Sequence, residues 1–93
     1  MSLIEEPTEA EIWNRTIQPE EGGLSPAAAQ ALLELELAPT DIALVNKLSA
    51  KARDGVLTNA EQRQLDNYLN VGRALELLKA KARLSLRRTA PQA

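Results

Sequence analysis

A stretch near the end of the chain, from Thr58 to about Arg88, predicts one long helix and constrains everything else. Thr58 and Glu61 have the spacing of a capping box, in which the hydroxyl and the carboxylate each accept a hydrogen bond from a main-chain N–H at the helix start. The residues that follow contain no proline and a single glycine, Gly72. At about 1.5 Å per residue the helix would be roughly 45 Å long. A chain of this size has to be organised around it.

Two short helices are predicted in the first part of the chain. A capping box of Thr8 and Glu11 begins the first, which reaches about Ile17. Ser25 is a good N-cap for the second, and the proline after it has no helical hydrogen bond to lose. The second helix covers residues 27–36 and is apolar nearly all round. We therefore expect it to be well buried, within the domain or between chains.

A third helix is predicted to pair with the long one. Thr40 or Asp41 is expected to cap it, and it reaches about Arg53, where Gly55 provides a helix stop. The short loop that follows makes the third helix and the long helix a helical hairpin. The buried stripe expected on the third helix follows the three-four spacing of one helical face: Ile42, Val45, Leu48 and Ala52.

These elements predict an all-α fold, a small bundle of about four helices with a helical hairpin of helices 3 and 4 and a long C-terminal helix. Residues 8–88 are expected to form a single helical domain, with flexible tails at 1–7 and 89–93. The chain has one Trp, one Tyr and no Phe. Its core must therefore be aliphatic, which suits helices packed along shallow grooves.

The apolar residues of the long helix fall on two faces. Because the third helix is about half as long, the turns past Ala80 are expected to extend beyond it. Gly72 in the helix interior costs about 1 kcal/mol relative to Ala. Its expected explanation is the close approach of a neighbouring helix or of a partner. The face predicted to pack inside the domain consists of Tyr68, Val71, Gly72, Leu75, Leu78 and Ala82.

The second face, at the end of the long helix, is the predicted partner surface. Leu77 and Leu84 are one heptad apart; they either cover the first helix and Trp13 or form a seam with a second copy or a partner. Basic residues surround them. The predicted partner-binding set is Leu77, Lys81, Arg83, Leu84, Arg87 and Arg88.

Charge is divided along the chain. Residues 1–39 carry eight glutamates against one arginine, whereas residues 71–93 carry six basic residues against one glutamate. This division favours antiparallel docking within the chain or a charged partner. Basic residues also stabilise the C-terminal end of a helix through its dipole, which is the simpler explanation. Nucleic-acid binding by the basic end is the weaker alternative, because the chain is acidic overall and no stacking aromatic lies nearby.

The residue inventory argues against catalysis. The chain has no His and no Cys, which removes the usual zinc ligands, the thiol nucleophile and the imidazole base. We predict a non-enzyme without catalytic, cofactor-binding or metal-binding residues. There is no run of about eighteen apolar residues. The start of the chain is acidic where a signal peptide would be basic. A cytoplasmic location is expected.

Several short segments resemble a family of small bacterial helical proteins, common in cyanobacteria and known mainly by its sequence pattern. The resemblance covers about residues 12–88. Members of the family are often encoded beside an HNH-type endonuclease. The resemblance therefore implies a two-gene arrangement and, by analogy, an antitoxin or a nuclease accessory subunit. The segments that carry it are Ile17–Gly22 with Leu24–Pro26, Ala52–Thr58, Leu65–Leu69 with Val71–Gly72, and Lys81–Leu86.

The sequence thus predicts a non-enzymatic protein-binding module, an antitoxin or accessory subunit that binds a partner nuclease through its C-terminal helix. Two alternatives remain open. One is a homodimeric structural adaptor joined through the long helices. The other is a small DNA-binding autoregulator that uses the basic end of the C-terminal helix.

Overall fold

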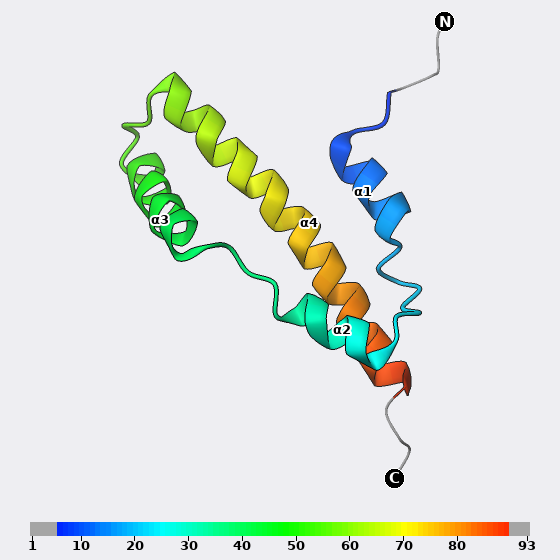
Figure 1. Cartoon of the computed structure of the whole chain (residues 1–93). Coiled ribbons are helices and arrows are strands. Elements are labelled where there is room, and N and C mark those ends of the chain that lie inside the picture. Colours follow the sequence, from blue (N-terminus) through cyan, green and yellow to red (C-terminus); the bar gives the residue numbers. More distant parts are fainter. Residues whose placement is uncertain (1–5, 90–93) are drawn as a thin grey trace, which may run out of the picture. The chain divides into compact units, whose positions relative to one another are not determined.

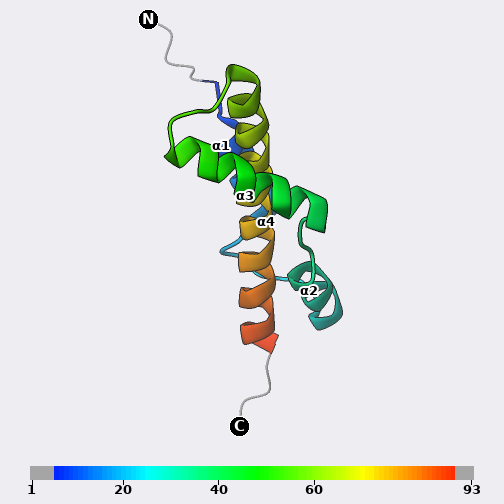
Figure 2. The same ribbon diagram turned by 90° about the vertical axis from the view of Figure 1, so that its left-hand side faces the viewer.

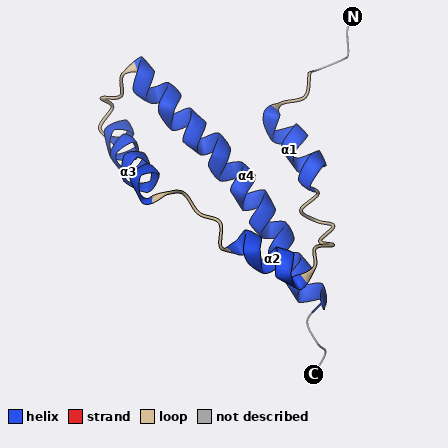
Figure 3. Ribbon diagram, in the orientation of Figure 1, coloured by secondary structure: helices blue, strands red, loops and turns tan. Residues whose placement is uncertain are grey.

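The computed structural model describes residues 6–89 and is all-α within them (Figures 1 and 3). This confirms the predicted fold class, with a long C-terminal helix. Of the predicted tails, residues 1–5 and 90–93 lie outside the described residues. No helix of the described part has the length and apolar character that crossing a membrane requires. The four helices are α1 (Glu9–Ile17), α2 (Pro26–Leu33), α3 (Pro39–Arg53) and α4 (Asn59–Thr89).

The chain groups into two compact units, and α4 contributes to both. Unit 1 combines Met1–Leu35 with Arg73–Ala93, and unit 2 is Glu36–Gly72. The region predicted as one helical domain therefore holds two units, and each is described by itself below.

Unit 2 is the predicted helical hairpin, in which α3 lies across the first part of α4 (Figure 2). The loop between them begins where expected. Gly55 has a φ of 71°, a left-handed conformation that glycine adopts without steric cost. At the end of α3 the N–H of Asp54 donates to the carbonyl of Ala50, and the N–H of Gly55 donates to the carbonyl of Ala52, each at 3.1 Å.

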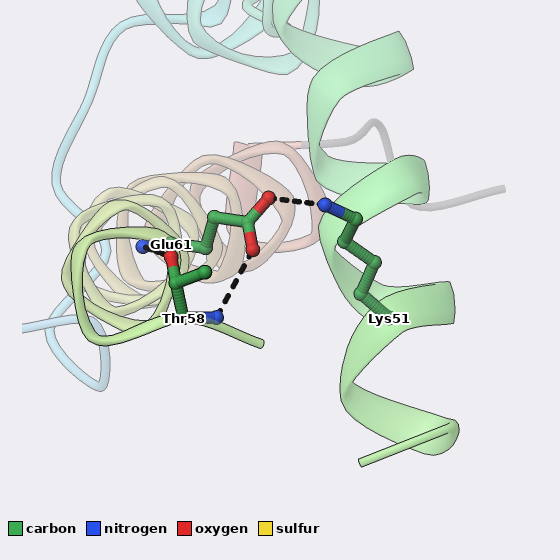
Figure 4. A network of polar contacts seen from close by, with 3 residues as sticks. All are labelled: Lys51, Thr58 and Glu61. Atoms are coloured by element: carbon green, nitrogen blue, oxygen red, sulfur yellow. Dashed lines mark hydrogen bonds and ion pairs between the residues drawn. The ribbon is translucent and has the colours of Figure 1, made fainter. Parts of the chain in front are cut away.

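The start of α4 is fixed by the predicted capping box (Figure 4). The N–H of Thr58 donates to Glu61 Oε1 at 3.0 Å, and the N–H of Glu61 donates to Thr58 Oγ1 at 3.1 Å. The second carboxylate oxygen of Glu61 accepts from Lys51 Nζ at 2.5 Å. The Lys51 ammonium, followed by the Thr58 N–H, holds the pKa of Glu61 below its ordinary value of 4.5. One carboxylate thus begins α4 and ties it to α3.

The buried stripe of α3 differs from the predicted one. Leu48 is buried, at 1% exposure, and packs in the core of unit 2 with Leu65 of α4 also buried. Ile42 and Ala52, however, are exposed. Polar contacts explain this difference, because one hydrogen bond near each end of α3 fixes how the helix is rotated. The residues of α3 that are buried or half-buried are Asp41, Leu44, Val45, Leu48, Ser49, Ala50 and Lys51.

The beginning of α3 also differs from expectation. Ala38 is the N-cap and makes no side-chain capping bond, while Pro39 occupies the first turn. Proline suits that position because its missing N–H has no helical partner to lose. Neither Thr40 nor Asp41 is the cap. Asp41 instead accepts a hydrogen bond from the Tyr68 hydroxyl at 2.5 Å, which ties the first turn of α3 to α4.

The second helix, α2, is shorter and more exposed than predicted. Its N-cap is Ser25, as expected, with the Ser25 hydroxyl accepting from the N–H of Ala28 at 3.2 Å. It ends at Leu33 rather than near residue 36. Ala29 is its buried residue, whereas Leu35, just beyond the helix, is exposed. The expectation of burial all round is therefore wrong within this chain.

In unit 1, α1 and α2 fold with the second part of α4. The Thr8–Glu11 capping box that begins α1 is present as predicted. The turns of α4 past Ala80, which were expected to extend beyond α3, belong to unit 1 and are covered there. Ala82 and Ser85 are both buried. The cause is the first third of the chain, which packs here and supplies cover that the hairpin alone cannot give.

The predicted packing face of α4 is only partly buried. Ala82 is buried, and Tyr68, Gly72, Leu75 and Leu78 are half-buried. Val71 is 48% exposed and does not pack. A Cβ added at Gly72 would meet no atom within 4 Å, so no neighbouring helix approaches closely there. The predicted residues do not form one continuous packing face, because the two parts of α4 belong to different units.

Truncating the central leucine of unit 2 should unfold the hairpin. We expect Leu48→Ala to lower the free energy of unfolding by about 2–4 kcal/mol, because it removes buried methyl groups and leaves a cavity. Urea unfolding followed by circular dichroism measures this. Leu69→Ala, at an exposed position of the same hairpin, is the control and should cost less than about 0.5 kcal/mol. Equal losses in the two variants would contradict the packing described.

The carboxylate of Glu61 should make stability depend on pH. A folded-state pKa below the ordinary value means that its stabilising effect is present above about pH 4.5 and is lost as the pH falls through the folded-state pKa. Glu61→Gln should therefore lower the melting temperature near pH 7 and flatten the decline below about pH 4.5. Melting curves of both proteins between about pH 7 and about pH 3 test this. Glu76→Gln, at a side chain 73% exposed, should keep the wild-type decline.

Candidate protein-binding surfaces

The segment Gln18–Leu24, between α1 and α2, is held on the end of α4 by basic side chains that bind its main chain. Lys81 Nζ donates to the carbonyl oxygen of Gln18 at 3.3 Å. Arg88 Nη1 donates to the carbonyl oxygen of Glu21 at 2.7 Å, and its Nη2 lies 3.5 Å from that of Glu20. The cations thus neutralise carbonyl dipoles, while the side chains of Glu20 and Glu21 remain exposed.

Ser85 completes this attachment from the buried side. Its hydroxyl oxygen accepts from the N–H of Leu24 at 3.0 Å and donates to the carbonyl of Lys81 at 2.8 Å. Ser85 is 1% exposed. A buried main-chain N–H without a partner is costly, so this hydroxyl fixes where the loop can lie. Sequence reasoning missed Ser85; the available signal was a lone serine among apolar positions of a long helix.

Gly22 is the position of closest approach between this loop and α4. It is buried and has a φ of 62°. A Cβ at this position would lie 3.5 Å from Arg88 Nη1, from Leu84 Cγ and from Ser85 Oγ. Those distances are ordinary van der Waals contacts, so glycine is needed here for the left-handed backbone rather than for room.

The structure divides the six residues predicted to bind a partner. Lys81, Leu84 and Arg88 lie against the Gln18–Leu24 segment, where Leu84 is next to Gly22. The residues not placed in that attachment are Leu77, which is half-buried, and Arg83 and Arg87, which are exposed. Arg83 forms an exposed ion pair with Glu76 at 3.7 Å.

A second surface, which we name the hairpin-end patch, is the end of unit 2 at which three large aliphatic side chains are exposed: Ile42, Leu69 and Val71. Leu69 and Val71 are two residues apart on α4 and therefore lie on different sides of that helix. These side chains are 42–48% exposed. The hydrogen bond from Tyr68 to Asp41 sets their two helices together at this end of the hairpin. Single exposed apolar residues are ordinary, but three of them at one end of a small unit leave apolar area that a partner could cover. Ile42 and Val71 were predicted to be buried, so the patch was missed.

A third surface, the α1 face, is acidic and aromatic. Ile12 and Trp13 are 48% and 39% exposed. The indole N–H of Trp13 donates to Glu9 Oε2 at 3.2 Å, which fixes the ring beside a carboxylate. The N–H of Thr8 holds the pKa of Glu11 below its ordinary value. This face therefore stays negatively charged near neutral pH.

The polar groups of these surfaces include one tyrosine with a shifted pKa. The Asp41 carboxylate, by accepting the hydroxyl proton of Tyr68 in a hydrogen bond, raises the pKa of that tyrosine. The phenol therefore holds its proton more firmly and is a weaker acid than an ordinary tyrosine. Within residues 6–89 no group of three or more carboxylates gathers as a metal site. The chemistry present is main-chain hydrogen bonding, apolar contact and charge.

Comparison of the chain with protein-family models, with curated proteins and with solved structures finds no match. The class of protein is therefore given by the fold alone, a small all-α protein with a long C-terminal helix. The resemblance to the bacterial family encoded beside HNH endonucleases stays a prediction.

Removing the Ser85 hydroxyl should release the loop without disturbing the hairpin. In Ser85→Ala the buried N–H of Leu24 loses its acceptor, and we expect unit 1 to lose about 1–3 kcal/mol. Hydrogen exchange of the Leu24 amide, followed by NMR, should accelerate correspondingly. Arg87→Ala, on the next half-turn of the same helix, is the control and should leave that amide protected. Unchanged protection in Ser85→Ala would show that another group holds the loop.

Proposed function

We propose that this chain is a non-enzymatic protein-binding module of the bacterial cytoplasm that binds a partner nuclease through α4 and restrains or positions it. One observation carries the binding part of this proposal. The hairpin-end patch places three large aliphatic side chains at one end of unit 2, each more than two-fifths exposed. Covering them would bury apolar area that the chain itself leaves in contact with water.

The patch is on the first part of α4, whereas the basic end of the helix is already engaged within the chain. Lys81 and Arg88, at the basic end, are already bonded to main-chain carbonyls of the Gln18–Leu24 segment. Leu69 and Val71 have no such cover, since both are exposed on the first part of the helix. The patch therefore offers a partner more apolar surface than the basic end does.

The nuclease as partner rests on the family resemblance, in which members are encoded beside an HNH-type endonuclease. An apolar patch supports protein binding of any kind and does not select among partners. An antitoxin would cover the nuclease active site, whereas an accessory subunit would leave it open. The effect of the chain on cleavage of DNA by the partner separates the two roles.

Charged substitutions in the patch should abolish binding of the nuclease. We expect Leu69→Glu/Val71→Glu to weaken binding at least about tenfold, because each carboxylate would have to be desolvated at the interface. Co-expression with the neighbouring nuclease, followed by pull-down and calorimetry, measures this. Gln64→Glu/Asn67→Asp adds the same charge to exposed positions of the same helix and should bind normally.

Two outcomes would overturn the proposal in different ways. If wild-type chain and nuclease elute separately, the nuclease is not the partner. If they bind and the Leu69→Glu/Val71→Glu variant, shown to be folded by circular dichroism, binds equally well, then the hairpin-end patch is not the surface.

A further inference from the structure

Unit 1 exposes two helical faces of opposite charge. The first is the α1 face, where Ile12 and Trp13 lie exposed beside Glu9. Glu6 and Glu11 are exposed in the same segment, and Arg15 is its one basic residue. Desolvating an indole at an interface contributes more than most side chains, and tryptophan is enriched where proteins meet.

The second face is a basic strip on the last part of α4. Ala80, Arg83 and Arg87 follow one another at three- and four-residue spacing, so they lie on one side of the helix. Both arginines are exposed. Arg83 has only a loose partner in Glu76, since its guanidinium is 3.7 Å from the carboxylate and both side chains are more than half exposed.

The two faces do not satisfy each other within one chain. Arg83 pairs with Glu76 of its own helix, so the ion pair given for the strip stays within α4. The carboxylate of Glu9 is engaged with the Trp13 indole in α1 itself. An aromatic acidic face and an arginine strip of matching chemistry are therefore both left on the surface of unit 1.

We propose that the occupant of the α1 face is a second copy of this chain, whose Arg83 and Arg87 lie against Trp13 and Glu9. The arrangement is reciprocal: in a two-fold dimer each copy contributes one acidic face and one basic strip, so every contact is made twice. Guanidinium groups pack on the indole face and pair with the flanking carboxylates. The hairpin-end patch takes no part and stays available to a different partner.

Sedimentation and fluorescence test the dimer on the full chain. Sedimentation velocity from about 1 μM to about 1 mM covers the range of ordinary transient complexes. We expect a monomer–dimer equilibrium that weakens with added salt. Trp13 is the single tryptophan of the chain, so its emission should shift to shorter wavelength as the dimer forms. A monomer throughout this range, or a Trp13 signal that does not follow dimerisation, would overturn the proposal.

A charge exchange tests the reciprocal pairing. Arg83→Glu/Arg87→Glu and Glu6→Lys/Glu9→Lys should each be monomeric alone, because each presents two faces of like charge. Mixed together, they should form a heterodimer, since each acidic face then meets a basic one. Failure of the mixture to associate would refute the assigned contact.

A matched control separates this contact from general charge effects. Arg53→Glu/Arg63→Glu makes the same charge change at exposed positions of unit 2 and should dimerise like wild type. If it is also monomeric, the contact is not the one assigned. The monomeric variants should still bind the nuclease through Leu69 and Val71, so this dimer and the proposed function can fail independently.

Discussion

Both compact units are built on α4, so the structure depends on one helix whose main chain is helical from Asn59 to Thr89. A helix in water gains little from its own hydrogen bonds, and most of its stability comes from packing. Here the packing has two sources. In unit 2, α3 supplies Leu48 and the Lys51 ammonium. In unit 1, the first third of the chain supplies a loop whose main chain is bound by polar side chains of α4.

In unit 1, hydrogen bonds between α4 and the loop compensate for a shortage of large buried apolar residues. Its buried residues on α4 are small: Ala74, Ala82 and Ser85. Little apolar area is available at such positions, so each hydrogen bond at the loop matters more. Lys81, Ser85 and Arg88 recur at four- and three-residue spacing along α4 and together meet carbonyls and an N–H of the loop. These contacts are made to main-chain atoms of the loop, so the glutamate side chains of the loop do not contribute to them.

Sequence predicted what depends on near neighbours and missed what depends on distant ones. The capping boxes at Thr8 and Thr58 and the helix stop at Gly55 are local, and all three were correct. The contact of Leu24 with Ser85 spans 61 positions, and no periodicity reveals it. Ile42 was misplaced because apolar spacing ignores polar bonds, and Asp41 and Lys51 set the rotation of α3. The hairpin-end patch was missed for the same reason, whereas the exposed arginines of the basic end were anticipated.

Gly72 has a consequence for how the molecule unfolds. It is the last residue of unit 2, it lies inside α4, and no atom approaches the space that a side chain there would occupy. The residue that least favours helix in this element therefore stands where packing support changes from one set of partners to another. Loss of helix that begins in one half of α4 can stop at this residue, because the other half is held by a different set of packing partners. We therefore expect the chain to unfold in two cooperative steps, each with its own midpoint and its own spectroscopic probe: Tyr68 in one half and Trp13 in the other.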